Sequence, residues 1–187
     1  MAETLIEDPV PTAPQAPPPT VPQVTMPPTP PLLRPLFRPR AKPPSRLSRR
    51  LNQAFVRANV FLYRRSRGRI GGRFMGMDVL LLTTIGRKTG VSRTNAVTYL
   101  WDSGRFVVCA AYGGATVHPA WYLNLEAVPR ARVDIGMERL DVTAEVLPPG
   151  PERDRLWNRL AEATPMYGRY QTMTPRLFPV VVLTPVD

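Results

Sequence analysis

The chain has 187 residues, 43% of them hydrophobic, and a formal net charge of +11. No apolar run approaches the ~20 residues that a membrane-spanning helix needs, so we expect a soluble protein with one modest core. A single cysteine, Cys109, and a single histidine, His118, exclude a disulfide framework, a Cys/His metal centre and most nucleophile pairs. Any active site must therefore work through a cofactor or by binding, and no metal is expected.

The charge is distributed unevenly along the chain. Residues 1–73 contain 13 basic and 3 acidic side chains, whereas residues 74–187 contain 12 and 11. The positive charge thus belongs to an N-terminal arm. Such an arm attracts polyanions, whether nucleic acid, anionic lipid or an acidic partner.

Residues 1–45 hold 15 of the 24 prolines. Proline lacks the backbone N–H and restrains the residue before it, which excludes a helix or a central strand. We expect a disordered, partly polyproline II tail, and its early acidic residues argue against a signal peptide. Two interpretations stay open: a solvated linker, including a start site assigned too far upstream, or a proline-rich ligand for an aromatic groove.

Residues 46–67 predict a basic amphipathic helix. Apolar residues recur there at intervals of three and four, namely Leu47, Leu51, Ala54, Phe55, Ala58 and Leu62. Two destinations are compatible: the apolar stripe packs on the globular body, or the arginines of residues 46–65 contact an anionic membrane surface. No helix-turn-helix pair or stacking aromatics accompany the basic run, so no nucleic acid is expected as a partner.

Residues 68–187 alternate short apolar runs with turn signals. The predicted strands are 78–84, 94–101, 105–111, 132–136, 140–147 and 179–186, and the predicted helices are 119–127 and 151–163. Short strands at this spacing with two peripheral helices predict a mainly β (α+β) fold, a small antiparallel barrel. We expect one domain and a monomer.

The segment from Gly86 to Gly90 is a basic loop between two predicted strands. Together with Arg93, its residues Arg87 and Lys88 place three cations beside exposed backbone amides, which suits a phosphate or a carboxylate. No helix follows, so it is not a Walker A loop. From these residues alone, a solvated basic hairpin remains the alternative.

Small residues end the strand 105–111. Ala110 and Ala111 precede Tyr112 and a Gly-Gly turn, an arrangement that lets a flat ring approach the backbone closely. Cys109 is expected to pack in the strand, because no activating base is adjacent in sequence.

The helix 119–127 contains Trp121, Tyr122 and Asn124. An aromatic pair at a helix start serves the core or a ligand, and the residues alone do not decide. His118 is interpreted as a helix cap or an exposed polar residue, in preference to a catalytic acid.

In order and spacing, the motifs from Gly86 to Asn124 resemble the deazaflavin-dependent nitroreductase family, actinobacterial oxidoreductases that use coenzyme F420. The match covers roughly residues 66–187. The resemblance implies a split β-barrel of the flavin-reductase or FMN-binding type, with an N-terminal helix and two peripheral helices. It also implies hydride transfer from reduced deazaflavin to a lipophilic acceptor such as a quinone.

The same resemblance implies the site residues. Cofactor contacts are expected from Leu82, Thr83, Arg87, Lys88, Thr89, Gly90, Arg93, Val97, Thr98, Ala110, Ala111, Tyr112, Trp121, Tyr122 and Asn124. Catalytic roles fall to Tyr167 and Tyr170, which would close over the deazaflavin and the acceptor. Ala111 replaces a frequent serine and Met173 a tryptophan, so the substrate preference is expected to differ and nitroimidazole reduction does not follow.

Two rival functions belong to other classes. One is a protein that binds deazaflavin or a lipid without turnover, and the other is an FMN-dependent reductase on the same barrel. A quinone acceptor and a basic helix fit one location, the cytoplasm at the inner face of the cell membrane.

Overall fold

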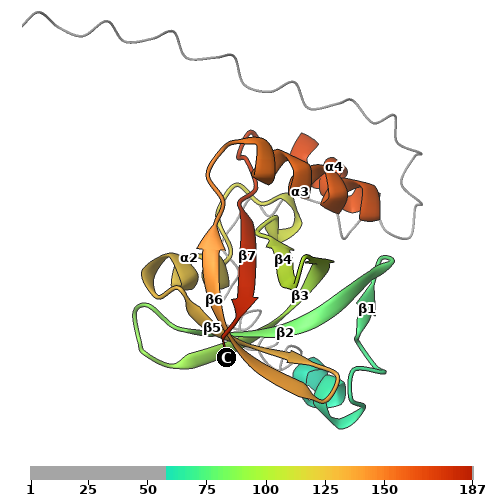
Figure 1. Ribbon diagram of the computed structural model, residues 1–187, viewed down its shortest axis with the longest axis vertical. Coiled ribbons are helices and arrows are strands. Elements are labelled where there is room, and N and C mark those ends of the chain that lie inside the picture. The colour runs from blue at the N-terminus through green and yellow to red at the C-terminus, as the bar shows by residue number, and fades with distance from the viewer. Residues whose placement is uncertain (1–57, 187) are drawn as a thin grey trace, which may run out of the picture.

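The computed structural model describes residues 58–186, and within them seven antiparallel strands form one sheet. The strands are β1 (Arg73–Phe74), β2 (Met77–Ile85), β3 (Ser92–Asp102), β4 (Arg105–Cys109), β5 (Arg130–Ile135), β6 (Glu138–Val146) and β7 (Val180–Pro185). Their order is β1-β2-β3-β4-β7-β6-β5, and an additional β2–β5 pairing closes β2 to β7 into a barrel (Figure 1). The predicted barrel is confirmed, with β1 as a strand that the sequence did not predict.

Strand β2 separates two apolar cores. Leu80 and Leu82 point into the barrel with Val97 of β3, whereas Val79 and Leu81 pack on the opposite face. The run of apolar residues in β2 reflects burial on both faces, because neighbouring side chains of a strand point to opposite sides. The register pairs Leu80 with Val97, so β3 follows the same alternation.

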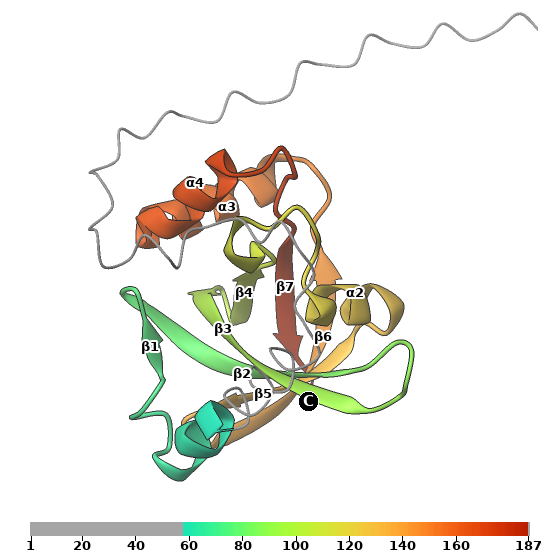
Figure 2. The ribbon, with the colours of Figure 1, turned by 180° about the vertical axis from the view of Figure 1, so that it is seen from behind.

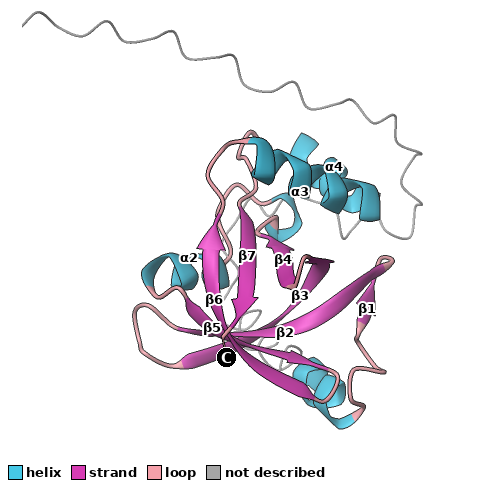
Figure 3. Ribbon diagram, in the orientation of Figure 1, coloured by secondary structure: helices cyan, strands magenta, loops and turns pink. Residues whose placement is uncertain are grey.

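Helices α3 (Pro151–Ala163) and α4 (Pro165–Thr172) lie together at one end of the barrel, and α2 (Ala120–Ala127) lies at its side (Figures 1 and 3). Helix α3 buries Leu156 and Leu160 against Val107 and Val182 of β4 and β7. Its first turn holds a proline and two acidic residues, all of which favour a helix N-terminus.

Helix α4 was not predicted. Pro165 occupies its first turn, where the missing N–H of proline costs nothing. The Thr164 hydroxyl accepts from the Met166 backbone N–H at 3.4 Å and caps the helix. The segment with Tyr167 and Tyr170 is therefore helical and fixed on α3.

The described part of the N-terminal helix covers residues 58–65 and packs on β2 and the β5–β6 hairpin (Figure 2). Its buried residue is Tyr63 (3% exposed), whose hydroxyl donates to Val79 O at 2.9 Å. Ala58 and Leu62 of the predicted stripe are exposed, Leu62 by 42%, so these two residues do not pack on the globular body. Tyr63 is the buried residue instead, because its ring packs on β2 while its hydroxyl donates a hydrogen bond to a backbone carbonyl. Residues 46–57 and the tail 1–45 lie outside the described residues.

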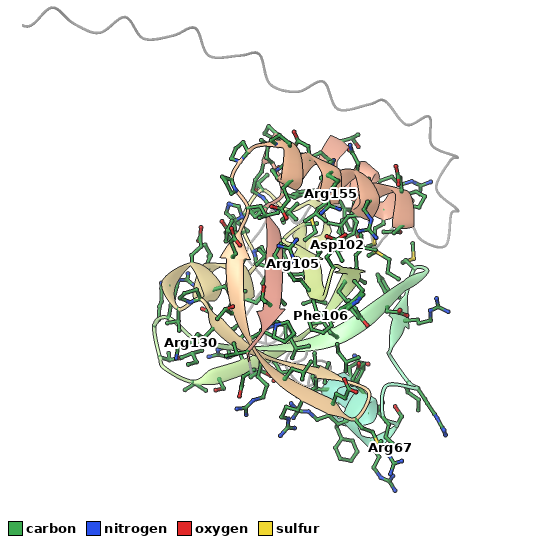
Figure 4. All side chains as sticks on the ribbon, in the orientation of Figure 1. Arg67, Asp102, Arg105, Phe106, Arg130 and Arg155 are labelled. Carbon is green, nitrogen blue, oxygen red and sulfur yellow. The ribbon has the colours of Figure 1, made fainter. Side chains whose placement is uncertain are left out.

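A buried carboxylate ties α3 to the β3–β4 hairpin. Asp102 accepts two hydrogen bonds from Arg155, at 2.9 and 3.1 Å, and another from Arg159, while Arg105 lies 3.7 Å away (Figure 4). The Arg155 hydrogen bonds hold the pKa of Asp102 below its ordinary value. Arg155 and Arg159 therefore serve to dock α3 on the β3–β4 hairpin.

Candidate functional site

The β2–β3 connection is a tight turn that presents its cations outward. Gly86 N donates to Val91 O at 3.0 Å, and Gly90 N donates to Gly86 O at 2.7 Å. Gly90 has φ +67°, a conformation that favours glycine. These hydrogen bonds close the turn, and the side chains of Arg87 and Lys88 are exposed.

The three cations of this loop, Arg87, Lys88 and Arg93, are exposed. Within residues 58–186, none of them forms an ion pair with a carboxylate. Other arginines, such as Arg64 of the N-terminal helix with Asp134, do have acidic partners. A group of cations without counter-charges is suited to an anionic ligand.

Asn124 fixes this loop to the barrel. Its Oδ1 accepts from the Arg87 backbone N–H at 3.2 Å and from Arg87 Nη1 at 3.4 Å, while its Nδ2 donates to Thr84 Oγ1 at 3.0 Å. Asn124 and Thr84 are both buried. The amide therefore joins α2, β2 and the start of the loop, a positioning role. Direct contact between Asn124 and a cofactor stays a prediction.

The predicted contacts on β2 and β3 fall on two faces of the hairpin. Leu82 and Val97 point into the barrel core, whereas Thr83 and Thr98 lie on the outer face. The hydroxyls of Thr83 and Thr94 are 2.9 Å apart on that outer face. A ligand on the outer face would reach the threonine side chains and only the backbone of Leu82 and Val97.

Tyr167 meets this face at Thr98. Their hydroxyl oxygens are 2.7 Å apart, which joins α4 to β3. Tyr167 is buried among the α3 residues, and this burial raises its pKa well above the ordinary range. Tyr170, one turn further on, is less buried, and its pKa is also raised by desolvation. Both phenols stay protonated at neutral pH.

The predicted ring-binding segment begins at the end of β4. Ala110 and Ala111 are buried, and Tyr112–Gly114 form a 3-10 turn in which the Tyr112 side chain is exposed. At Gly114 (φ +76°), a Cβ atom would lie 3.1 Å from Tyr170 O, so α4 packs directly on this turn and requires glycine there. The structure thus brings the predicted ring-binding turn against the helix of the predicted catalytic tyrosines.

Cys109 precedes this turn and is fully enclosed in the second core. Burial raises the pKa of its thiol to about 12, which removes thiolate reactivity at neutral pH. Its interpretation as a packing residue is consistent with this environment.

Trp121 and Tyr122 lie mainly in the barrel core, with Trp121 7% exposed. The Tyr122 hydroxyl donates to Glu126 Oε1 at 2.6 Å, and burial raises the pKa of Tyr122 to about 12. Of the two interpretations that the sequence left open, packing is thus evident for both rings. A contact with a cofactor stays a prediction.

His118 is not a helix cap, because Pro119 occupies the N-cap position of α2 and makes no side-chain cap bond. Instead, its Nδ1 lies 3.2 Å from Arg176 Nη1. Desolvation and the Arg176 charge lower the pKa of His118. Arg176 was not predicted from the sequence, since a single arginine between α4 and β7 fits no periodic pattern or motif.

The outer face of β3 joins the basic loop to α4. From Arg93 to Thr98 the chain advances about 16 Å along β3 at the rise of an extended strand. The exposed cations of the loop lie at one end, and Thr98, whose hydroxyl contacts Tyr167, lies toward the other. The fold is a closed antiparallel barrel, and its basic loop suits an anionic ligand.

Comparison with known proteins identifies the family. The family model described as F420H(2)-dependent quinone reductase matches residues 55–185. A Mycobacterium tuberculosis protein named F420H(2)-dependent quinone reductase is 40% identical over 141 residues, which are 74% of this chain and 95% of that protein. The chain therefore belongs to the F420H(2)-dependent quinone reductase family.

Solved structures agree with this assignment. A structure described as an F420-H2 dependent reductase is 39% identical, with a TM-score of 0.52, over 56% of this chain and 92% of its own. A second, described as a domain-swapped dimer, is 33% identical, with a TM-score of 0.54, over 71% of this chain and 98% of its own. The split barrel is thus shared with a reductase of the same cofactor class.

Proposed function

We propose that the protein transfers a hydride from reduced F420 to a quinone while the cofactor lies along the outer face of β3. Family membership makes the protein an F420H2-dependent oxidoreductase with F420 as its cofactor. The proposal adds the position of the cofactor. The observation that supports it most is the group of unpaired cations Arg87, Lys88 and Arg93 at one end of the hairpin.

The residues present fit F420, which joins a flat deazaflavin ring to a phosphate and an acidic oligoglutamate tail. The exposed cations suit the tail, because charge-assisted hydrogen bonds to phosphate and carboxylate are strong. Ala110 and Ala111 are buried, so the flat ring is proposed to lie against the exposed Tyr112 and Gly113 of the turn that follows them. When bound, F420 supplies the hydride chemistry, and the chain supplies orientation and electrostatics.

Each group of this chain has a distinct task in the proposal. Asn124 holds the loop in place, so that Arg87 and Lys88 anchor the tail without reorganising. Tyr167 and Tyr170 on α4 keep their protons at neutral pH. Tyr167 is buried and its hydroxyl contacts Thr98, so it holds α4 on β3, whereas the less buried Tyr170 is the phenol proposed to donate a hydrogen bond to a quinone oxygen. The proposed acceptor side is thus separated from the tail side along β3.

A titration and an activity assay test this function. Purified protein is titrated with F420 and with FMN, and the oxidation of F420H2 is then followed with menadione. We expect saturable F420 binding, weaker FMN binding and menadione-dependent oxidation. F420 binding without turnover would favour the non-catalytic alternative, and tighter FMN binding would favour the flavin enzyme.

A peripheral membrane position is a second part of the proposal. Phe61 (67% exposed) in the helical segment and Met137 (73%) at the tip of the β5–β6 hairpin are apolar and lie on docked elements, since Tyr63 Oη accepts from Gly136 N at 3.4 Å. Arg67 lies at the same end of the molecule (Figure 4). Each basic residue near an anionic leaflet contributes about 1 kcal/mol. No helix in residues 58–186 has the length and apolarity to cross a bilayer.

Sedimentation with vesicles tests the membrane part. The protein should sediment with vesicles containing phosphatidylglycerol at low salt, and less so in Phe61→Ser/Met137→Ser. Trp101→Ser is the matched control, because Trp101 is an exposed apolar residue on β3. The membrane proposal fails if wild-type protein stays in the supernatant at low salt.

We further propose that the protein is a monomer, because the β2–β5 pairing closes the barrel within a single chain. We also propose that it is located in the cytoplasm. Light scattering coupled to size-exclusion chromatography measures the mass. A mass of about twice 20.9 kDa would refute the monomer.

A further inference from the structure

We propose that Arg176 is the positioning residue of the F420 site: it holds the Ala110–Ala115 turn and the His118 ring in the geometry that receives the deazaflavin. The inference rests on the proposed function, because it assigns that turn to the ring. It adds a residue from the connector between α4 and β7, a segment for which no sequence motif predicted a function.

The guanidinium of Arg176 directs its N–H groups at this turn and at the His118 ring. Its Nη1 donates to Ala110 O at 3.1 Å, its Nη2 donates to Ala111 O and Ala115 O at 3.0 Å each, and its Nε donates to Ala115 O at 3.1 Å. The remaining contact is the one from Nη1 to His118 Nδ1. Arginine is the only side chain with five donors in a planar fork, so no other residue can make this set.

The partners of this guanidinium are neutral. Three are backbone carbonyls, the fourth is a ring nitrogen, and the cation also lies 4.8 Å from the centre of the Phe178 ring. Partial burial lowers the pKa of Arg176 from its ordinary value without removing the charge. A charge kept away from a carboxylate leaves the turn with a positive potential, which suits an electron-rich, anionic ligand.

The same turn is held from the other side by α4. Gly114 leaves no room for a Cβ atom beside Tyr170 O and Met173 Cβ. Arg176 follows α4 by only a few residues, and Gln171 Nε2 donates to Arg176 O at 2.9 Å. The chain from Tyr170 to Arg176 therefore locks the proposed ring side and the proposed acceptor side into one rigid unit.

The contact with His118 fixes a tautomer. Arg176 can only donate, so Nδ1 of His118 accepts and the ring is neutral with its proton on Nε2. The groups that face this ring are Arg176, the Tyr122 ring at 4.8 Å and the Glu126 carboxylate. Among them, the Arg176 charge opposes protonation and Glu126 favours it. The result is a neutral N–H donor beside the turn.

The experiment uses the full chain with Arg176→Lys and Arg176→Gln, and Arg153→Gln as the matched control. Arg153 also donates to a backbone carbonyl of the same connector, Phe178 O at 3.3 Å, but makes no hydrogen bond to the turn. Each protein is measured for its F420 dissociation constant, its thermal midpoint and the side-chain ¹⁵N shifts of His118.

We expect a rise of about tenfold or more in the dissociation constant for both Arg176 variants, because displaced contacts at a reacting centre have effects of this size. Arg153→Gln should lower the thermal midpoint and leave the dissociation constant within about twofold. His118 should show the Nε2-protonated neutral form in the wild type, and its pKa should rise in Arg176→Gln.

Other results overturn the proposal in distinguishable ways. If wild type and Arg153→Gln bind no F420, the proposed function itself fails and the positioning role fails with it. If the wild type binds F420 and both Arg176 variants bind it equally well, only the positioning role fails. If both Arg176 variants unfold, Arg176 is a stability residue and the positioning role is likewise rejected.

Discussion

The two ends of strand β3 both gather arginines, but they use them differently. At its C-terminal end, Asp102 accepts hydrogen bonds from Arg155 and Arg159 and is buried. At its N-terminal end, the loop with Arg87 and Lys88 is exposed and has no carboxylate partner within residues 58–186. Similar side chains thus serve helix docking at one end and remain available to a ligand at the other.

The difference shows that counting charges along a sequence does not locate an anion site. What matters is whether the fold supplies each cation with a counter-charge. Arginines that surround a buried carboxylate are not available to an anionic ligand, because the carboxylate already neutralises them. Removing the carboxylate would leave these arginines repelling one another. An amide such as Asn124, in contrast, orients the loop through Arg87 without neutralising it.

The largest expected effect separates the two ends by affinity. Arg87→Ala/Lys88→Ala should weaken F420 binding by about 2–6 kcal/mol, at about 1–3 kcal/mol for each of the two charge-assisted contacts, with little change in thermal midpoint. Arg155→Ala/Arg159→Ala removes the same number of charges and should do the reverse. Fluorescence titration and thermal unfolding measure both. Equal losses of affinity in the two double variants would remove the distinction between the ends.

The next effect tests the structural end by pH. Because the folded pKa of Asp102 lies below its ordinary value of 3.8, its ionised form stabilises the fold above that value and this contribution is lost as pH falls through the folded pKa. Asp102→Asn should lower the free energy of unfolding by about 1–2 kcal/mol at pH 7. The effect is modest because solvent around the partly exposed guanidiniums screens their interaction with the carboxylate. Urea unfolding at several pH values measures it.

The difference between Asp102→Asn and wild type should shrink toward acid pH, while F420 affinity at pH 7 stays unchanged. A difference that is constant down to pH 3 would contradict an ionic role for this carboxylate.

A smaller effect concerns the point where α4 meets β3. Thr98→Val and Tyr167→Phe each remove one hydroxyl of a pair 2.7 Å apart. The single variants should each cost about 0.5–1.5 kcal/mol of unfolding free energy, and the double variant should cost less than their sum. Chemical denaturation of the four proteins gives the coupling energy. Strict additivity would show that the two hydroxyls do not interact.

The smallest effect is that of salt. Exposed cations are screened beyond about 10 Å at 0.1 M salt, so F420 affinity should fall a few-fold between 0.05 and about 0.3 M NaCl. In Arg87→Ala/Lys88→Ala the salt dependence should be weaker. A dependence that is unchanged in the variant would place the responsible cations elsewhere.

Much of the barrel could be predicted from local sequence. The apolar run of β2 and the proline with acidic residues at the start of α3 are each set by neighbouring residues. Helix α4 could not be predicted, because Pro165 reads as a boundary until Thr164 is known to cap the helix. Tyr63 was missed for a related reason, since its hydroxyl finds partners only once β2 and the β5–β6 hairpin are in place.

The candidate site, like the fold, could be predicted from the sequence only where its residues are neighbours along the chain. The basic loop was predictable, because its cations and glycines are contiguous in sequence. The contact of Thr98 with Tyr167 and the bonds from Arg176 to the turn join residues more than 60 positions apart. No periodicity encodes such pairs. They become visible only when the barrel closes and α4 packs on the end of β4.

The central claim is that the loop with Arg87 and Lys88 holds the anionic tail of F420. The most direct measurement compares the affinity of F420 with that of the deazaflavin lacking the phosphate and glutamate tail, in wild type and in Arg87→Ala/Lys88→Ala. The account predicts that wild type prefers F420 by about tenfold or more and that the variant loses this preference. A preference of the same size in both proteins would contradict it.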